Sequence, residues 1–354
     1  MQRFAFQSAR SVAEAATLAS RTVAAAMLSD PALAAATDCV VMKAGGIDLL
    51  GLMKEGLLRP ARLVNLRGIP GLDTIAEDGD GMRIGALVTL EQLAAHPLVR
   101  ARYTALADAA SRSASPQIRH VATLGGNLLQ RPHCWYFRSA AHRCSRKGGD
   151  RCFAFAGENQ YHAVFGQAGC AMVHPSTAAA ALAAFDARVE LVDAKGATRS
   201  VKLEKFVVGP DIDITRETDL RAGEMLTAVL LPPLPASACS VFLKQGEKSA
   251  DWSIADVAVV LDCASDGRCR RAAIVLGAAA PIPWRAQQAE AVLVGQKIDR
   301  AVAQAAGQAA IAGAVALPHN AYKLPILATL TRRAVLQAAG ANNQAGATNL
   351  EIVR

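Results

Sequence analysis

The feature that most constrains this chain is the segment 123–177, which holds four of its eight cysteines. Cys134, Cys144, Cys152 and Cys170 are separated by nine, seven and seventeen residues. The arginines, glycines and aromatics between them follow neither a helical nor a strand period. A long irregular loop in a compact domain is usually functional or disordered. Four cysteines in such a loop favour a bound group that holds the loop together.

Cysteine thiolates bind zinc or an iron–sulfur cluster, or they pair as disulfides. Structural zinc sites usually take close C-x-x-C pairs, which this segment lacks. Disulfides are typical of small, core-poor domains, whereas this chain has 354 residues, of which 52% are hydrophobic. A [4Fe–4S] cluster tolerates irregular spacing of its four thiolates. The residues alone leave these three interpretations open, and a fourth is four unrelated cysteines.

Composition restricts the class of protein. The length is sufficient for two or three domains. The net charge of +8 is dispersed, without a basic tail or interleaved aromatics, which argues against nucleic-acid binding. The N-terminus lacks a basic region followed by a continuous apolar core, and no stretch reaches the length of a membrane span. We expect cytoplasmic folding without a signal peptide, while export together with a signal-bearing partner stays open.

Local patterns predict a mixture of helices and hairpins, which indicates the α+β class. A capping-box pattern at Ser11 and Glu14 predicts one helix from there to about Leu28. A second capping box, Thr89 with Gln92, begins a short helix that Pro97 ends. Four other helices are expected. One ends near 56, and the others cover 103–113, 176–184 and 301–317. The expected strands are 39–42, 63–66, 82–85, 188–192, 198–201, 224–231, 253–263 and 269–276.

Two glycine turns are candidate anion-binding loops. Gly45 and Gly46 follow a predicted strand and precede a helix, so the backbone N–H groups of 45–47 would form an anion nest. The segment Thr123–Asn127, TLGGN, would wrap a phosphate or a ribose in the same way. Neither loop has the spacing of the Rossmann fingerprint, and each signal is weak alone. Because the second turn leads into the cysteine-rich loop, the two turns together favour a bound dinucleotide beside a redox cluster.

These motifs resemble the FAD subunits of the xanthine oxidase family of molybdenum hydroxylases. The string AGGIDL at 44–49 is similar to that family's AGGTDL flavin loop, TLGGNL at 123–128 to its second flavin loop, and HPST at 174–177 to its HPSD segment. The strings EML at 224–226 and FLK at 242–244 match its later flavin-contacting strand and lysine. PWR at 283–285 resembles the start of a helix in its C-terminal domain. The match runs in order along nearly the whole chain.

The resemblance implies FAD contacts at thirteen positions. They are Lys43, Ala44, Gly45, Gly46, Ile47, Asp48, Leu49, Thr123, Gly126, Asn127, Thr177, Leu226 and Lys244. Two of them depart from the family pattern. Ile47 stands where the family usually has Thr, and Thr177 stands where it has Asp, so each loses a polar contact. Because backbone N–H groups can still hold the pyrophosphate, we expect FAD binding to survive.

The resemblance also implies a domain plan. A two-lobed FAD-binding domain of the vanillyl-alcohol-oxidase (PCMH) type would cover 1–235, with lobes at about 1–60 and 61–235. An iron–sulfur loop at 131–170 belongs to the second lobe. A small α+β domain of the CO dehydrogenase flavoprotein C-terminal type would cover 236–354. The prolines after the strand 224–231 mark the boundary.

The cysteine loop is similar to one version within the family. Its start, QRPHCWYF at 130–137, and a final cysteine before HPS resemble the [4Fe–4S] loop of periplasmic aldehyde oxidoreductases, and 4-hydroxybenzoyl-CoA reductases carry an inserted loop too. The resemblance implies a cluster on Cys134, Cys144, Cys152 and Cys170. Histidines near these cysteines are expected to be hydrogen-bonded or exposed, and 135–137 to pack around the cluster. The other four cysteines, Cys39, Cys239, Cys263 and Cys269, are expected to be structural thiols.

The function implied is that of an FAD and [4Fe–4S] electron-transfer subunit of a heteromeric molybdenum aldehyde oxidoreductase. Aldehyde oxidation would take place on a large subunit with the molybdenum cofactor. A small subunit with two [2Fe–2S] clusters would pass electrons to this chain, which hands them to an external acceptor. No catalytic residue is expected here. The alternatives are a subunit of a 4-hydroxybenzoyl-CoA reductase-like enzyme and a non-redox zinc-loop adaptor.

Overall fold

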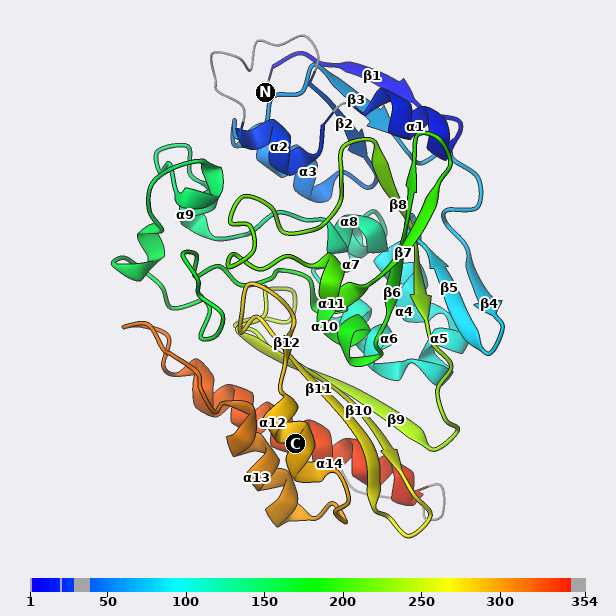
Figure 1. Ribbon diagram of the computed structural model, residues 1–354, viewed down its shortest axis with the longest axis vertical. Coiled ribbons are helices and arrows are strands. Elements are labelled where there is room, and N and C mark those ends of the chain that lie inside the picture. The colour runs from blue at the N-terminus through cyan, green and yellow to red at the C-terminus, as the bar shows by residue number, and fades with distance from the viewer. Residues whose placement is uncertain (1, 20, 29–38, 345–354) are drawn as a thin grey trace.

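Figure 1 shows the computed structural model, which describes residues 2–19, 21–28 and 39–344, as three bodies along its long axis. We name them the N-terminal, middle and C-terminal bodies, and each is built on one sheet. The cysteine segment, 129–175, lies beside them on one flank. The mixture of helices with mainly antiparallel sheets confirms the α+β class. Within the described residues, no helix has both the length and the apolar character needed to cross a membrane.

The N-terminal body has a three-stranded parallel sheet, in the order β1 (Ala5–Ser8), β3 (Arg62–Asn65) and β2 (Val40–Lys43). Its helices are α1 (Val12–Leu18), α2 (Val23–Leu28) and α3 (Ile47–Lys54). Ser11 caps the first of these, but the single helix predicted to Leu28 is wrong. The chain turns extended at Ala19 because its two halves pack into different cores. Leu18 packs with Ala15, whereas Met27 packs with Leu52.

The middle body holds a five-stranded antiparallel sheet. Its strands, in spatial order, are β4 (Ile75–Asp78), β5 (Gly81–Gly85), β8 (Glu224–Leu231), β6 (Arg188–Asp193) and β7 (Thr198–Lys202). Its helices are α4 (Leu90–Ala95), α5 (Pro97–Arg102), α6 (Thr104–Ser111), α7 (Pro116–Arg119), α8 (Leu124–Leu128), α10 (Thr177–Ala184) and α11 (Leu203–Phe206). The predicted hairpins and the Thr89–Gln92 capping box are confirmed. Pro97 ends α4 as expected, but it also begins α5.

The C-terminal body is a four-stranded antiparallel sheet with helices on one face. Its strands are β12 (Trp284–Arg285), β11 (Cys269–Gly277), β10 (Ala255–Cys263) and β9 (Ala238–Gln245). Its helices are α12 (Gln287–Leu293), α13 (Arg300–Ala310) and α14 (Lys323–Gln344). Phe242 of β9 and Ala258 of β10 lie in one buried cluster with Phe185 of the middle body. The two bodies therefore share a core across the predicted proline boundary.

The cysteine segment is irregular, as predicted. It contains only three short turns of helix: α9 (Trp135–Arg138), η1 (Ser145–Lys147) and η2 (Phe153–Phe155). Its four cysteines are spread over the whole length of the loop, so their positions depend on contacts with the three bodies.

Candidate functional site

A large cavity, which we call the central cavity, opens between the three bodies. All thirteen positions expected to contact a cofactor line it, although they come from segments as distant as β2 and β9. They are Lys43, Ala44, Gly45, Gly46, Ile47, Asp48, Leu49, Thr123, Gly126, Asn127, Thr177, Leu226 and Lys244. Their contact with FAD itself stays a prediction, because the cavity shows only that they share one space.

The first glycine loop owes its shape to two close constraints. Gly46 has φ +87°, a left-handed conformation that favours glycine, and it caps α3. At Gly45, a Cβ atom would lie 2.2 Å from the carbonyl oxygen of Val121. The loop therefore touches the backbone just before the second glycine loop. Glycine at 45 and 46 is required by the chain itself, whether or not a ligand is bound.

The second glycine loop forms the start of α8. The hydroxyl of Thr123 caps this helix by accepting from the N–H of Gly126 at 3.1 Å. The side-chain oxygen of Asn127 accepts from the hydroxyl of Ser176 at 2.6 Å, and Ser176 in turn caps α10. Two helix N-termini and their caps thus meet at one wall of the cavity. At the start of α8, the N–H groups of Gly125 and Gly126 are already taken by the carbonyl of Ala86, at 2.8 Å, and by the hydroxyl of Thr123.

The two positions that depart from the family pattern behave differently. Ile47 is 45% exposed, so its apolar side chain faces the open cavity. Thr177 is buried, and its hydroxyl lies 2.5 Å from the hydroxyl of Ser113. That threonine is therefore already satisfied by a protein partner. The two departures leave the backbone donors of the cavity in place.

Charged side chains of the cavity are largely engaged with the protein. Asp48 accepts from the guanidinium of Arg138 and, at 3.0 Å, from the backbone N–H of Arg131, which ties α3 to the cysteine segment. Lys244 donates to the carbonyls of Arg112 at 2.8 Å and Asp251 at 2.6 Å. Burial lowers the pKa of Lys244, and also that of Lys43, whose ammonium reaches the carbonyl of Ala44.

A second, smaller cavity lies within the cysteine segment, and we call it the cysteine cavity. Its wall contains all four predicted ligands, Cys134, Cys144, Cys152 and Cys170. Tyr136, Phe137 and Met172 also line it, together with polar side chains that include Arg146. The other four cysteines lie elsewhere, Cys39 in the N-terminal body and the remaining three on β9, β10 and β11. Four thiols around one space are the donor set of a [4Fe–4S] cluster.

The four thiols differ in charge preference. A hydrogen bond from Cys152, opposed by burial and helped by Arg146, lowers the pKa of Cys170 to about 5. Burial raises the pKa of Cys134 to about 11 and also raises that of Cys144. Sharing its proton with Cys170 raises the pKa of Cys152. Apart from Cys170, these thiols stay protonated at neutral pH until a metal displaces the protons.

Two buried side-chain nitrogen atoms lie beside the sulfur atoms of the cysteine cavity. Nε of Arg146 donates to Sγ of Cys170 at 3.5 Å, and Nε2 of His162 lies 3.2 Å from Sγ of Cys134. Burial lowers the pKa of His162 to about 4, so its ring is neutral. His162 is thus hydrogen-bonded, as the sequence suggested. Within the described part of the chain, no group of three or more His, Cys, Asp or Glu side chains is arranged to hold a single metal ion.

Sequence reasoning missed several residues that shape the two cavities. Arg131 and Glu217 line the central cavity, and Arg146 lines the cysteine cavity. His133 also lines the central cavity and stacks on Trp252, with ring centroids 3.9 Å apart, so the cysteine segment meets the loop before β10 there. No local pattern singles these residues out, because each has its partner in a distant segment. A buried arginine in an irregular polar loop becomes visible only once burial is known.

Known protein families match the chain in two consecutive parts. Residues 2–234 match the family described as FAD binding domain in molybdopterin dehydrogenase, and 241–338 match the CO dehydrogenase flavoprotein C-terminal domain. The chain is 36% identical over 344 residues to the aldehyde oxidoreductase FAD-binding subunit PaoB of Escherichia coli, covering 96% of this chain and 99% of that protein. It is 28% identical to the carbon monoxide dehydrogenase medium chain of Hydrogenophaga pseudoflava, covering 76% and 77%.

Solved structures agree in fold. Carbon monoxide dehydrogenase from Hydrogenophaga pseudoflava contains a chain that superposes with a TM-score of 0.70 at 28% identity, covering 96% of this chain and 98% of that one. A chain of quinoline 2-oxidoreductase from Pseudomonas putida superposes with a TM-score of 0.69 at 25% identity, with the same coverage. The expected pairing of an FAD-binding domain with a CO dehydrogenase-type C-terminal domain is confirmed.

Proposed function

The chain belongs to the family of FAD-binding medium subunits of the molybdenum hydroxylases, and from this premise we propose that it is the FAD and [4Fe–4S] electron-transfer subunit of a molybdenum-dependent aldehyde oxidoreductase. The observation that carries the finer part of this proposal is the cysteine cavity. Cys134, Cys144, Cys152 and Cys170 are spread over an irregular loop and yet line one space. The relative that is 36% identical over nearly its whole length is named as an aldehyde oxidoreductase subunit.

The donor set favours a cluster over a zinc ion. Structural zinc sites usually take their cysteines as close C-x-x-C pairs, and this loop has no such pair. A [4Fe–4S] cluster takes four thiolates and tolerates irregular spacing along the chain. Tyr136, Phe137 and Met172 line the same space as the four thiols. The arrangement therefore supports the cluster and speaks against the zinc-loop adaptor.

The proposed FAD site is the central cavity with its thirteen predicted contacts. The glycine loop at 45–46 would present backbone N–H groups to the pyrophosphate, and Lys244 with Leu226 would lie toward the flavin ring. When bound, FAD stores two electrons and exchanges them singly or in pairs, and the cluster carries one at a time. The chain's own part is binding, orientation and the exclusion of water. We assign no residue of this chain to a proton transfer.

The proposal includes partners and a domain boundary. Substrate oxidation would occur on a large subunit with the molybdenum cofactor, and a small subunit with two [2Fe–2S] clusters would deliver the electrons. An external acceptor would receive them from this chain. We place the domain boundary at 235, between the two matched families. The proposed FAD-binding domain is 1–235, with lobes at about 1–60 and 61–235, and the proposed C-terminal domain is 236–354.

Serine substitution tests the cluster. Cys152→Ser removes one proposed thiolate, so the purified chain should lose iron and the broad visible absorption of an iron–sulfur centre. Flavin should remain, because the glycine loops lie outside the cysteine cavity. Cys263→Ser is the matched control, since Cys263 is buried on β10 opposite Cys269.

Iron content and the visible spectrum separate the possible results. Iron lost from Cys152→Ser and kept in Cys263→Ser supports the proposal. Full iron content in Cys152→Ser, or iron loss from Cys263→Ser, would mean that the ligands are wrongly assigned. A yellow, iron-free protein that holds zinc would reject the cluster while leaving FAD binding intact.

A further inference from the structure

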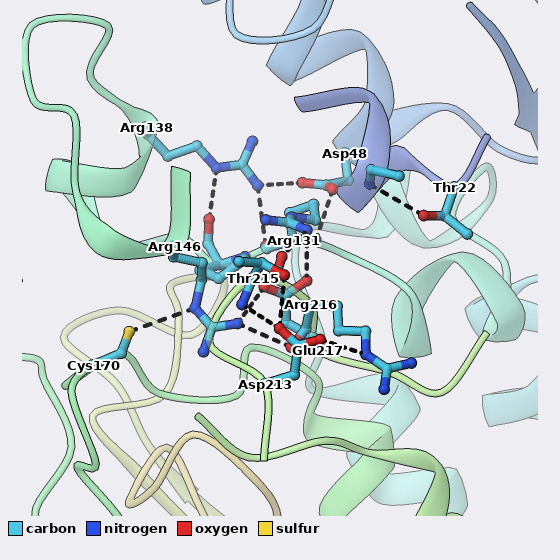
Figure 2. A network of polar contacts seen from close by, with 12 residues as sticks. Thr22, Asp48, Arg131, Arg138, Arg146, Cys170, Asp213, Thr215, Arg216 and Glu217 are labelled. Atoms are coloured by element: carbon cyan, nitrogen blue, oxygen red, sulfur yellow. Dashed lines mark hydrogen bonds and ion pairs between the residues drawn. The ribbon is translucent and has the colours of Figure 1, made fainter. Parts of the chain in front are cut away.

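A buried carboxylate stands between two buried arginines beside the cysteine cavity. Figure 2 shows the side chains of Arg131 and Arg146 converging on Glu217. Oε1 of Glu217 accepts from Nη1 of Arg146 at 2.7 Å, and Oε2 pairs with Nη1 of Arg131 at 3.2 Å. The two arginines are 2% and 1% exposed, and Glu217 is 5% exposed. We call these three residues the arginine–glutamate bridge.

The bridge spans the wall between the two cavities. Arg131 and Glu217 line the central cavity, whereas Arg146 lines the cysteine cavity. At its far end, Nε of Arg146 donates to Sγ of Cys170 at 3.5 Å. Figure 2 shows this sulfur on the opposite side of the guanidinium from Glu217. One continuous chain of contacts therefore runs from the central cavity to one proposed cluster ligand.

The bridge carries more positive charge than its own carboxylate cancels. It has two guanidinium groups and one carboxylate, and its other acceptors are neutral carbonyls, those of Thr215 and Arg216. Nη2 of Arg146, and Nε and Nη2 of Arg131, have no hydrogen-bond partner although they are buried. Removing a charge from water is costly unless an opposite charge or hydrogen bonds compensate. At the Arg146 end, the acceptor that faces the guanidinium is the sulfur of Cys170, at 3.5 Å.

We propose that Arg146 sets the reduction potential of the cluster through its N–H···S bond to Cys170, and that Glu217 is the positioning residue that aims it. This inference rests on the [4Fe–4S] site proposed above. Reduction adds one electron without forming or breaking a bond, so it increases the negative charge next to Arg146. A cationic donor stabilises the more negative state, and hydrogen bonds to cluster sulfurs are a known control of potential. The bond therefore raises the midpoint potential.

Glu217 acts with the opposite sign. Its carboxylate offsets part of the positive charge while it holds the guanidinium of Arg146 in place. A glutamine at 217 has nearly the same shape and keeps one oxygen acceptor, which can still face Nη1 of Arg146 while its amide group takes the place of the oxygen that faces Arg131. The negative charge is removed. The potential should then rise, because the surroundings of the cluster become more positive. If the bridge served only to hold the fold together, replacing Arg146 or Glu217 would leave the midpoint potential of the cluster unchanged.

The experiment is an EPR-monitored redox titration of the purified full-length chain with iron and flavin bound, using dithionite as the electron donor. Arg146→Met, which removes the cation and the N–H donor, should lower the midpoint potential of the cluster. Glu217→Gln should raise the midpoint potential by a smaller amount, because Arg146 lies between Glu217 and the cluster ligand Cys170. Arg143→Met is the matched control. It removes an equal charge next to Cys144, but from an exposed side chain that water and salt screen, so its potential should not move.

Iron content is measured first for every variant. If Arg146→Met fails to retain iron, Arg146→Lys decides, because lysine keeps the charge but lacks the fork that reaches two partners at once. A lowered midpoint potential of the cluster in Arg146→Met or in Arg146→Lys supports the proposal. Iron-loaded Arg146 variants with the wild-type potential, or a lowered potential in Glu217→Gln, overturn it. A wild-type chain that cannot be loaded with iron overturns the proposed cluster itself, and this inference with it.

Discussion

Asp256 is an unusual residue in the core of the C-terminal body. It lies on β10, is 2% exposed, and has an oxygen, Oδ1, without a hydrogen-bond partner. Burial raises its pKa to about 6, although Lys244 and Lys323 act in the opposite direction. The folded protein therefore binds this proton more tightly than the unfolded chain does. The stability that protonated Asp256 contributes is complete below the pKa that this carboxyl has in the unfolded chain, and it is lost as the pH rises through 6.

Asp256→Asn should remove this pH dependence. The difference in stability between Asp256→Asn and wild type should be about 2 kcal/mol more favourable to the variant at about pH 7 than at about pH 4. The reason is that wild type must bury an ionised carboxylate only at the higher pH. Melting temperatures of the two proteins at both pH values test this expectation. Asp80→Asn, in the exposed turn between β4 and β5, is the control. An equal difference in melting temperature at both pH values would contradict the role assigned to Asp256.

Thr177 shows how one residue can match its own surroundings rather than a family pattern. The aspartate expected there would place a charge in a buried position beside Ser113. Threonine instead forms a neutral hydroxyl pair, which burial penalises far less. The departure is therefore consistent with the local packing.

Among the elements, α10 is the helix whose start is most closely tied to the proposed FAD site. The hydroxyl of Ser176 accepts from the N–H of Ala179 at 3.0 Å and donates to Oδ1 of Asn127 at 2.6 Å. One hydroxyl thus caps α10 and orients a side chain of the second glycine loop. The helix itself is buried along its whole length, so it is a rigid support for that wall.

Ser176→Ala should weaken both functions of this hydroxyl. Losing the cap should cost about 1 kcal/mol of stability, and the released Asn127 should lower FAD retention. Ser11→Ala is a matched control, because Ser11 caps α1 by the same type of bond and does not line the central cavity. Chemical unfolding and flavin content after dialysis measure the two effects. Equal flavin content in the two variants would argue against a role for Asn127 in the site.

The cysteine segment is held in the whole molecule by the C-terminal body. Asn320 is fully buried, and its amide donates to the carbonyls of His162 and Ala163 at 3.1 and 3.0 Å. Lys323 donates to the carbonyls of His162 at 2.9 Å and Ala278 at 2.6 Å. These bonds fix the returning arm of the loop between Cys152 and Cys170. The cysteine cavity thus depends on a residue 158 positions farther along the chain than His162.

Asn320→Ala should loosen that arm. Unpaired buried carbonyls cost about 1–3 kcal/mol each, so we expect a loss of about 2 kcal/mol, since Lys323 still serves His162. The segment between Cys134 and Cys170 should also become more sensitive to limited proteolysis. Gln304→Ala, on the exposed face of α13, should change neither property. Protease resistance equal to that of the control would show that other contacts hold the loop.

Features that depend on neighbouring residues were readable in the sequence. The caps at Ser11 and Thr89, the helix that begins at Ser176, the hairpins and most strand positions are confirmed, since each arises from hydrogen bonds or alternation within a few residues. The strand, glycine turn and helix around Gly45 and Gly46 were readable in the same way, while the binding role of the glycine loops stays a prediction. The helix expected over 11–28 was wrong because its break reflects packing of its halves into separate cores, and a helical pattern carries no information on that.

Other features required the folded molecule. The four cysteines were recognisable by type and by resemblance, but only the fold brings them to one cavity, because the intervening loop has no regular structure of its own. The bridge of Arg131, Glu217 and Arg146 left no local signal. Ionic pairs of this kind form between segments far apart in the chain, and their strength comes from burial. Burial is a property of the packed protein, so tertiary structure alone decided which charges meet beside the cluster site.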